Sequence, residues 1–229
     1  MHKLIFGIFA HPDDEAFGPS GTLLSEVRGG AELHLMTLTA GEKGANPDNL
    51  PRLSEVRLAE WRKAGALIGA HTMHHLGHTD GELDNVSMLR ASEQIEQLVR
   101  DTLASHASPV EIEFMSMDTN DITGHIDHIV ASRAAHLVFY KLKEAGLPLT
   151  CLRLVCIPRE DTGDTPHTDF VFMEPGRLPE EINETVDNRN HLDEVLAIMR
   201  CHCTQRNDCE AHIDHLSERV AIDHFIVKE

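Results

Sequence analysis

The residues best suited to chemistry lie near the start of the chain. His11, Asp13 and Asp14 follow the apolar run 4–9, within the segment Ala-His-Pro-Asp-Asp-Glu at 10–15. Such a run predicts a buried strand, and a strand of an open α/β sheet delivers the residues after it to the carboxyl edge of the sheet. Imidazole and carboxylate suit Zn²⁺ or a similar divalent ion, and a catalytic site needs only three protein ligands. We therefore expect His11 and Asp14 to be ligands, and Asp13 to be free to take a proton from water.

A turn that leads into a helix is the alternative interpretation of this segment. Pro and Asp are common in turns, and Asp is common at helix N-caps. Glu15 would then begin the next helix, where a carboxylate interacts favourably with the helix dipole. Residues 10–15 alone do not decide between the two interpretations.

A second cluster favours the metal site. His125, Asp127 and His128 follow another strand-like run, 109–117, and the polar turn 118–121. Two apolar strands that each end in His and Asp residues are what a site assembled across the carboxyl edge of a sheet requires. His128 can supply the missing third ligand.

The strongest rival cluster lies in the last thirty residues. It holds thiol and imidazole groups that suit a structural Zn²⁺, namely Cys201, Cys203, Cys209, His212 and His215. Their spacing is irregular, and we expect a helix instead, because apolar residues recur at helical intervals and leave both histidines on a solvated flank. These apolar residues are Ile213, Leu216, Val220 and Ile222 or Phe225. Because His-Ile-Asp-His at 212–215 repeats the sequence of 125–128, His215 is also an alternative third catalytic ligand, but we prefer His125 and His128 as the site pair.

These segments together make the chain resemble the PIG-L/LmbE-like N-acetylglucosaminyl deacetylase superfamily. Its members are metal-dependent enzymes that remove acetyl groups from N-acetylglucosamine-type sugars and related amides. The resemblance covers most of the sequence, and its most specific parts are 10–15 and 125–128. Its shorter parts are Thr-Ala-Gly-Glu-Lys-Gly at 39–44, the helix 53–60, the loop 77–83 and His-Cys-Thr-Gln at 202–205, where Thr replaces the Ser of the family's His-x-Ser-Gln.

The resemblance implies a division of labour at the metal. By position, His11, Asp14 and His128 would bind the ion, which is Zn²⁺, Fe²⁺ or another divalent transition metal. Asp13 would be the general base that takes a proton from the attacking water.

The resemblance also implies roles around the substrate. His125 would face the developing oxyanion, and Asp127 would orient His125 and favour its imidazolium form. Arg57 and Asp80 would contact the sugar. Thr123 stands where some relatives present a Tyr that helps to hold the intermediate, so that help must come from elsewhere.

Two alternatives remain open at this point. One is a non-catalytic sugar-binding or metal-binding protein on the same scaffold, against which the presence of both Asp13 and His125 argues. The other is an amidohydrolase that acts on a non-sugar N-acyl substrate, which the sequence does not separate from a sugar deacetylase.

Composition narrows the choice of partner and compartment. With 20 Lys and Arg against 38 Asp and Glu, the formal net charge is −18, which repels nucleic acid. We expect a small-molecule partner, an N-acetylated amino sugar conjugate, and a homo-oligomer is compatible with the sequence.

No run approaches the ~20 apolar residues that span a bilayer, and no signal-peptide cleavage site follows the start. Five cysteines suit a reducing compartment, so we expect a cytoplasmic protein.

The order of segments predicts an α/β fold. Strand-like and helix-like segments alternate, which indicates a Rossmann-like open, mostly parallel sheet with helices on both faces, formed by a single domain over residues 1–229. We expect strands near 3–9, 31–39, 71–77, 110–117 and 150–157, and helices near 20–28, 52–69, 87–105 and 128–144.

Three further segments carry local expectations. In the helix 52–69 we expect an apolar face and an end at Gly69; the face comprises Leu53, Val56, Leu58, Ala59, Ala64, Leu67 and Ile68. Segment 158–179 is rich in Pro, Gly, Asp and Thr, which predicts a long loop with one added strand at 170–172.

Four histidines lie in the third predicted strand and its loop, namely His71, His74, His75 and His78. We expect surface or core positions for them, although such clusters also bind metal. Of the four, His78 is the one that we expect nearest to a substrate, because it borders the Asp80 loop.

Overall fold

One sheet of seven strands organises the part of the chain that the computed structural model describes, residues 2–162 and 175–229. The strands are β1 (His2–Phe9), β2 (Glu32–Thr39), β3 (Thr72–His78), β4 (Val110–Met117), β5 (Leu149–Cys156), β6 (Glu184–Asp187) and β7 (Ile222–Lys228). Their order across the sheet is β3-β2-β1-β4-β5-β7-β6. Strands β1 to β5 are parallel, whereas β7 is antiparallel to both β5 and β6. The prediction of an open, mostly parallel sheet is confirmed.

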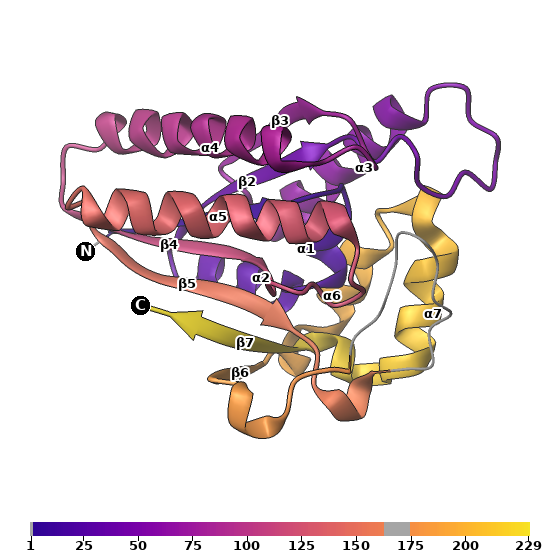
Figure 1. Ribbon diagram of the computed structural model, residues 1–229. Helices are drawn as coiled ribbons and strands as arrows, with labels where there is room; N and C mark the ends of the chain where they lie inside the picture. Colours follow the sequence, from indigo (N-terminus) through magenta and orange to yellow (C-terminus); the bar gives the residue numbers. More distant parts are fainter. Residues whose placement is uncertain (1, 163–174) are drawn as a thin grey trace.

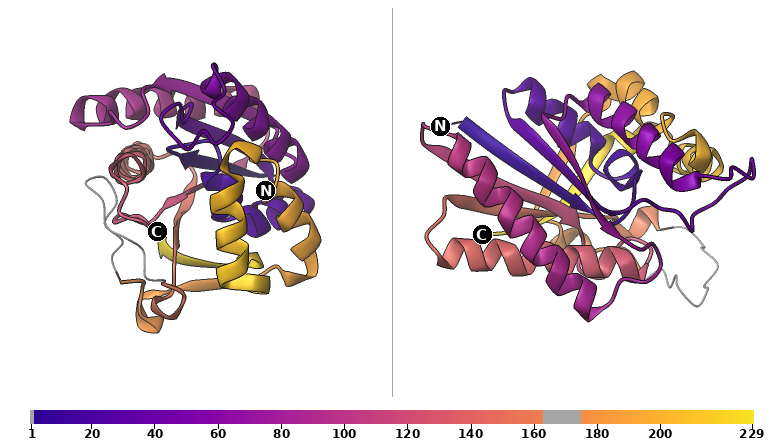
Figure 2. Two further views of the ribbon diagram at one scale, coloured as in Figure 1. Left: turned by 90° about the vertical axis from the view of Figure 1, so that its right-hand side faces the viewer. Right: turned by 90° about the horizontal axis from the view of Figure 1, so that it is seen from above.

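Helices cover both faces of this sheet, as the sequence predicts. Helices α4 (Asn85–Ser105) and α5 (Ile126–Glu144) lie side by side on one face (Figure 1). The opposite face carries α1 (Asp14–Phe17), α2 (Ser20–Arg28), α3 (Leu53–Ile68) and α6 (Leu192–Met199), with α7 (Arg206–Leu216) beyond them (Figure 2).

Strand β1 forms the centre of both hydrophobic cores. Leu4, Phe6 and Ile8 pack into the core under α4 and α5, whereas Ile5 and Phe9 pack into the core under α2 and α3. Successive side chains of a strand point to opposite faces, so a strand covered on both faces must be apolar throughout. This explains the uninterrupted apolar run that follows Lys3.

The strand order reverses at β1, which determines where a site can form. From β1 the chain adds β2 and β3 on one side, and then returns to place β4 and β5 on the other. At such a switch point the connections from the carboxyl ends of two neighbouring strands leave in opposite directions and open a crevice between them. The segments after Phe9 and after Met117 both emerge there.

The buried face of α3 differs from the predicted face. Its buried residues are Leu53, Arg57, Glu60, Trp61, Ala64, Gly65 and Ile68, whereas Ala59 and Leu67 are exposed. The stripe runs from Leu53 through Trp61 at intervals of three and four residues and includes two charged side chains, which an apolar pattern does not reveal. Gly69 ends the helix in the left-handed conformation, with φ of 93°, as predicted.

The predicted C-terminal helix is too long. Helix α7 ends at Leu216, Ser217 has φ of 54°, and a 3-10 turn leads into β7. Ile222 and Phe225 therefore lie on a strand, where Phe225 pairs with Val155 of β5. Strand pairing outweighed the helical spacing of these residues.

The histidines of α7 are placed differently from one another. His215 is exposed, as expected, whereas His212 is half-buried and stacks against Phe17 with ring centroids 6.3 Å apart. All five cysteines of the chain are unpaired. Among residues 2–162 and 175–229, three or more side chains lie close enough to share a metal ion in a few places, and none of these places includes the C-terminal Cys and His residues of the rival zinc site.

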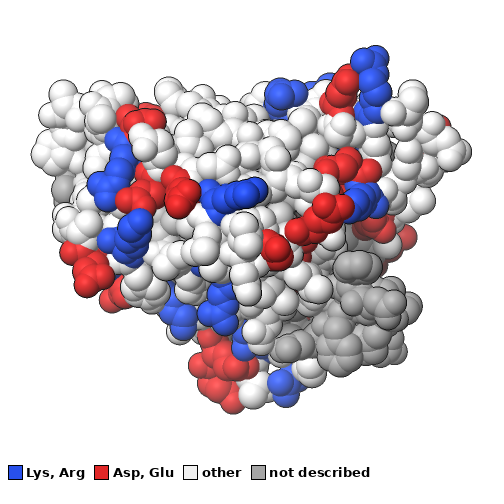
Figure 3. Space-filling model, turned by 45° about the horizontal axis from the view of Figure 1, so that its top comes forward, with Lys and Arg blue, Asp and Glu red and all other residues white. Residues whose placement is uncertain are grey.

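The long loop after β5 is described only in part. The predicted strand at 170–172 lies outside the described residues, and Pro158 and Arg177 form a parallel bridge on either side of that gap. No helix in the described part of the chain is both long and apolar enough to cross a membrane. Acidic and basic side chains are intermixed on the face shown in Figure 3.

We expect Trp61→Ala to destabilise the fold strongly. Trp61 is 2% exposed in the core between α3 and the sheet, so the substitution leaves a cavity that costs roughly 3–5 kcal/mol of unfolding free energy. Urea denaturation followed by circular dichroism measures this loss. Leu67→Ala, on the exposed side of the same helix, is the control and should cost less than about 0.5 kcal/mol. Equal losses would contradict the orientation of α3.

Candidate active site

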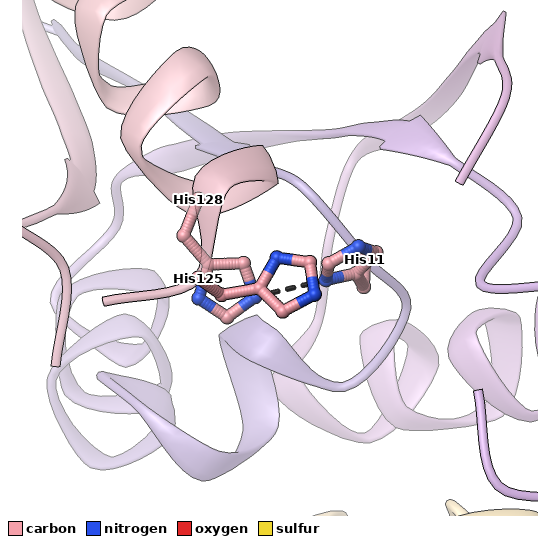
Figure 4. A group of neighbouring side chains, drawn as sticks. All are labelled: His11, His125 and His128. Atoms are coloured by element: carbon pink, nitrogen blue, oxygen red, sulfur yellow. Dashed lines mark hydrogen bonds between the residues drawn. The ribbon is translucent and has the colours of Figure 1, made fainter. Parts of the chain in front are cut away.

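The three predicted ligands lie close together at the switch point of the sheet, where His11 and Asp14 both contact His128. His11 follows β1, and His128 lies in the first turn of α5, so their rings face each other across the crevice (Figure 4). Nδ1 of His11 lies 2.8 Å from Nε2 of His128, and Oδ1 of Asp14 lies 3.3 Å from the same Nε2. His125 joins them, because one ring nitrogen each of His11, His125 and His128 lie within 4.8 Å of one another.

Two carboxylates hold the other nitrogen of His11. Its Nε2 lies 3.0 Å from Oδ1 of Asp80 and 3.2 Å from Oδ2 of Asp127, and all three residues are buried. Burial by itself would lower the pKa of His11, but the hydrogen bonds to Asp127 and Asp80 outweigh it and raise this pKa to about 10. The carboxylates therefore determine the ring orientation and direct Nδ1 toward His128.

Asp121 holds the other nitrogen of His128, a role that the sequence did not reveal. Its Oδ1 lies 2.8 Å from Nδ1 of His128, and its Oδ2 accepts hydrogen bonds from the backbone and hydroxyl of Thr123 and from the backbone N–H of His125. Burial lowers the pKa of His128, but the charges of Asp121 and Asp14 raise it to about 9. The polar turn 118–121 was visible in the sequence, but nothing in its spacing selects Asp121 as the partner of His128.

This arrangement fits a cation. When Nε2–H of His11 and Nδ1–H of His128 both point at carboxylates, the two remaining nitrogens direct their lone pairs at each other over 2.8 Å. Asp14 adds a carboxylate oxygen to the same space. Electron-pair donors at such distances need a positive charge between them, which a proton supplies without a metal and a metal ion can supply in its place, and backing carboxylates are typical of metal-binding histidines. The donor set suits a divalent transition metal.

Asp13 has an unusual backbone. Its φ is 123°, a region that side-chain-bearing residues rarely adopt. It occupies the N-cap position of α1, but its side chain makes no capping hydrogen bond. Oδ2 instead accepts a hydrogen bond of 2.9 Å from Nη2 of Arg57. Burial raises the pKa of Asp13 to about 6, although the charge of Arg57 acts against this. Asp13 therefore does occupy the N-cap position that the turn interpretation gives to an Asp, but its carboxylate binds Arg57 and does not cap the helix.

Arg57 and Asp80 mainly contact other parts of the protein. The buried guanidinium of Arg57 donates to the carbonyls of Pro12 and Gly41, each over 2.8 Å, and so joins the two loops that follow β1 and β2. Asp80 contacts His11 through Oδ1 and accepts the N–H of Lys43 through Oδ2. Both residues line the cavity, and their contact with a substrate stays a prediction.

The predicted pairing of Asp127 with His125 differs from the structure. The Asp127 carboxylate contacts His11 and accepts the N–H of Gly81, while His125 receives the backbone N–H of Asp127 on its Nδ1. Burial, with the nearby His128, lowers the pKa of His125. The structure therefore places the Asp127 carboxylate on His11 and not on His125, and a neutral His125 would carry its proton on Nε2.

The 202–205 segment contacts two buried glutamates next to the candidate site, Glu15 and Glu60. Nε2 of the buried His202 lies 3.3 Å from Oε1 of Glu15, whose Oε2 accepts the N–H of Asp13 over 3.3 Å. Thr204 donates its N–H and its hydroxyl to Glu60 of α3. Glu15 thus lies fully buried in an ion pair, and helix-dipole stabilisation alone does not explain it.

A cavity of about 690 Å³ opens over these groups. Besides the site residues, its wall includes Phe17, Lys43, Thr123 and Gln205, and this size accommodates a small molecule. His78, expected nearest to a substrate, contacts Gln94 and borders a different surface hollow.

The fold and cavity define a Rossmann-like α/β protein with a His/Asp pocket at the switch point of its sheet. Within this class, residues 6–139 match the family model described as PIG-L, GlcNAc-PI de-N-acetylase. Because the match covers more than half of the chain, the chain belongs to the PIG-L family, as the sequence motifs predicted.

Individual proteins are similar to this chain in sequence or in fold. The chain is 27% identical to 1D-myo-inositol 2-acetamido-2-deoxy-alpha-D-glucopyranoside deacetylase 2 of Saccharopolyspora erythraea, over 96% of this chain and 91% of the relative. Its fold is similar to that of N,N'-diacetylchitobiose deacetylase from Pyrococcus horikoshii, with TM-score 0.66, 16% identity and coverage of 99% and 83%. The 4-carboxy-2-hydroxymuconate hydratase GalB from Pseudomonas putida KT2440 is also similar, with TM-score 0.65, 13% identity and coverage of 100% and 97%. The chemistry must therefore be argued from the site and not from the fold.

We expect Asp121→Asn to weaken metal binding. Both oxygens of Asp121 accept hydrogen bonds, and an amide offers only one acceptor oxygen, so either His128 or the Thr123 turn loses its partner. Loss of a carboxylate behind a metal-binding His costs roughly 10–100-fold in metal affinity, which competition with a fluorescent zinc chelator measures. Asp101→Asn, an exposed change on α4, is the matched control. Unchanged affinity in Asp121→Asn would show that His128 does not need this partner.

Proposed function

We propose that this protein is a metal-dependent deacetylase. In the proposed reaction, water attacks the acetamido carbonyl of an N-acetylglucosamine-type sugar or conjugate and releases acetate and the free amine. The observation that carries the proposal is that Nε2 of His128 lies 2.8 Å from Nδ1 of His11 and 3.3 Å from Oδ1 of Asp14, in the wall of a cavity that Asp13 and His125 also line. Membership of the PIG-L family supports the same reaction.

His11, Asp14 and His128 would hold the metal, Zn²⁺ or another divalent ion such as Fe²⁺. Such an ion, when bound, polarises a carbonyl and lowers the pKa of its water to near neutrality. Asp80, Asp127 and Asp121 keep the two histidines in the tautomers that leave a lone pair for it.

Asp13 is the proposed general base. Its Oδ2 is held by Arg57 at 2.9 Å, and its backbone conformation brings it to the cavity beside Asp14. A carboxylate whose pKa is raised to about 6 is a better proton acceptor than an exposed one and is still ionised at pH 7. Asp13 therefore takes a proton from the attacking water and can return it to the nitrogen of the departing amine.

His125 is the proposed oxyanion donor. The Asp127 N–H occupies Nδ1, so the proton on Nε2 is free to be donated into the cavity. When the carbonyl carbon becomes tetrahedral, this N–H stabilises the negative oxygen, a contribution of roughly 2.7–4 kcal/mol for a well-placed donor. A neutral imidazole suffices for this role.

The substrate is assigned by its class. We propose a small N-acetylated amino sugar conjugate, bound by a single domain over residues 1–229 within the cavity that Arg57 and Asp80 border. The curated relative's printed name, an acetamido-glucopyranoside deacetylase, supports a sugar linked to inositol as one member of that class. Compartment and oligomeric state stay predictions from the sequence.

Release of primary amine from a substrate panel tests the proposal. We expect amine from N-acetylglucosamine, diacetylchitobiose or an N-acetylglucosaminyl inositol, loss of activity after chelation, and recovery when Zn²⁺ or Fe²⁺ is restored. An N-acetyl amino acid serves as the non-sugar control. Amine from that control alone would favour a non-sugar amidohydrolase, and sugar binding without any amine would favour a non-catalytic protein. Either result overturns the proposal.

We expect Asp13→Asn and Asp14→Ala to separate base from ligand. Asn keeps the shape of Asp13 and tolerates positive φ, so Asp13→Asn should retain the metal and lose roughly 10²–10⁴ in turnover. Asp14→Ala removes the oxygen beside His128 and should lose the metal itself. Metal content by mass spectrometry and kcat on the same preparations measure both effects. Equal metal loss in both variants would refute this division of roles.

A further inference from the structure

A second histidine cluster lies at the amino end of the sheet and surrounds Glu32. Nε2 of His2 and Nε2 of His106 lie 3.1 and 3.4 Å from Oε2 of Glu32. Nε2 of His34 and Nε2 of His71 lie 3.2 and 3.5 Å from its Oε1. Four imidazoles thus direct the same ring nitrogen at one carboxylate.

This cluster is remote from the candidate active site. His2 begins β1, whereas His11 follows the end of that strand, and eight residues of strand extend roughly 25 Å. Glu32 begins β2 and His106 follows α4, so the cluster joins three segments (Figure 1, where the N-terminus lies beside the loop that follows α4). None of these residues lines the cavity over His11.

His106 is oriented like a metal ligand. Its Nδ1 lies 2.9 Å from the carbonyl oxygen of Thr102, and since a carbonyl only accepts, Nδ1 must carry the hydrogen. A neutral ring then directs the lone pair of Nε2 at the Glu32 carboxylate, which is also an acceptor. Two acceptors in contact need a proton or a cation between them. A carbonyl behind one nitrogen of a His is the usual support for a metal on the other.

His34 gives an independent indication. It is 2% exposed, its Nδ1 contacts the hydroxyl of Thr72 over 2.7 Å, and its ring stacks on Phe6. Its Nε2 is buried and has no hydrogen-bond partner, although it points toward Glu32. The buried Nε2 of His34 is therefore a further unsatisfied nitrogen beside the Glu32 carboxylate.

We propose that His2, Glu32 and His106 form a second metal site, which binds a divalent transition metal. Their ligand atoms lie within 4.8 Å of one another, and a mixture of imidazole and carboxylate suits Zn²⁺, Ni²⁺ or Cu²⁺. His34 and His71 lie at the other carboxylate oxygen and orient it. Because the ligands come from β1, β2 and the end of α4, the ion links these elements, and its role is structural.

Zinc stoichiometry in a background without the first site tests this proposal. In the double variant Asp14→Ala/His128→Ala, equilibrium dialysis against Zn²⁺ at pH 7.5 should give one ion per chain. Adding His106→Ala or Glu32→Gln to this background should reduce the value to near zero. His74→Ala is the matched control, because His74 lies on the neighbouring β3 and contacts Thr72 but not Glu32, and it should keep the ion.

The intact protein provides a second measurement that does not depend on the double variant folding. Here His106→Ala should lower bound Zn²⁺ from two ions per chain to one. Zinc should still raise the Tm of Asp14→Ala, which keeps the second site. Adding His106→Ala to that variant should abolish this remaining rise in Tm. Amine release by His106→Ala alone should stay within about two-fold of the unsubstituted protein, since the cluster does not reach the cavity. If no ion binds in the background, or if it persists in both His106→Ala and Glu32→Gln, the cluster is a proton-sharing network and the proposal is wrong.

Discussion

Two imidazole nitrogens that face each other across 2.8 Å are the interaction on which the rest of the candidate site depends. Neither His11 nor His128 would hold that position alone, because each ring is held from behind by buried carboxylates. Those carboxylates are held in turn by the backbone N–H groups of the loops after β2, β3 and β4. The contacts along the carboxyl edge of the sheet thus hold these two ring nitrogens close together.

This arrangement concentrates negative charge in a buried place, where uncompensated charge lowers the stability of the fold. Asp14, Asp80, Asp121 and Asp127 are all buried at the edge of the sheet, and uncompensated burial of carboxylates opposes folding. The histidines compensate part of this charge, with pKa values raised to about 10 for His11 and about 9 for His128. Protons and a divalent cation therefore compete for the same nitrogens, which makes binding of the cation release protons.

The supporting contacts come from distant parts of the chain. Arg57 of α3 joins the loops after β1 and β2 and holds Asp13, while His202 and Thr204 join the C-terminal part of the chain to Glu15 and Glu60. The same helix face that buries Trp61 also buries Arg57 and Glu60. Helix α3 therefore both packs the core and positions the proposed base.

The sequence by itself determined the alternation of strands and helices, the apolar β1, and the two His/Asp segments that follow β1 and β4, because periodicity and end signals are local properties. It placed His11, Asp14 and His128 at one sheet edge through the rule for parallel strands. Only the tertiary structure decided that Asp127 supports His11, that Asp121 supports His128, that Arg57 holds Asp13, and that residues 222–228 form a strand. These pairings depend on strand order and on the direction of side chains at the sheet edge, which the chain acquires only when the sheet forms. Asp127 and His11, for example, are 116 positions apart in the sequence.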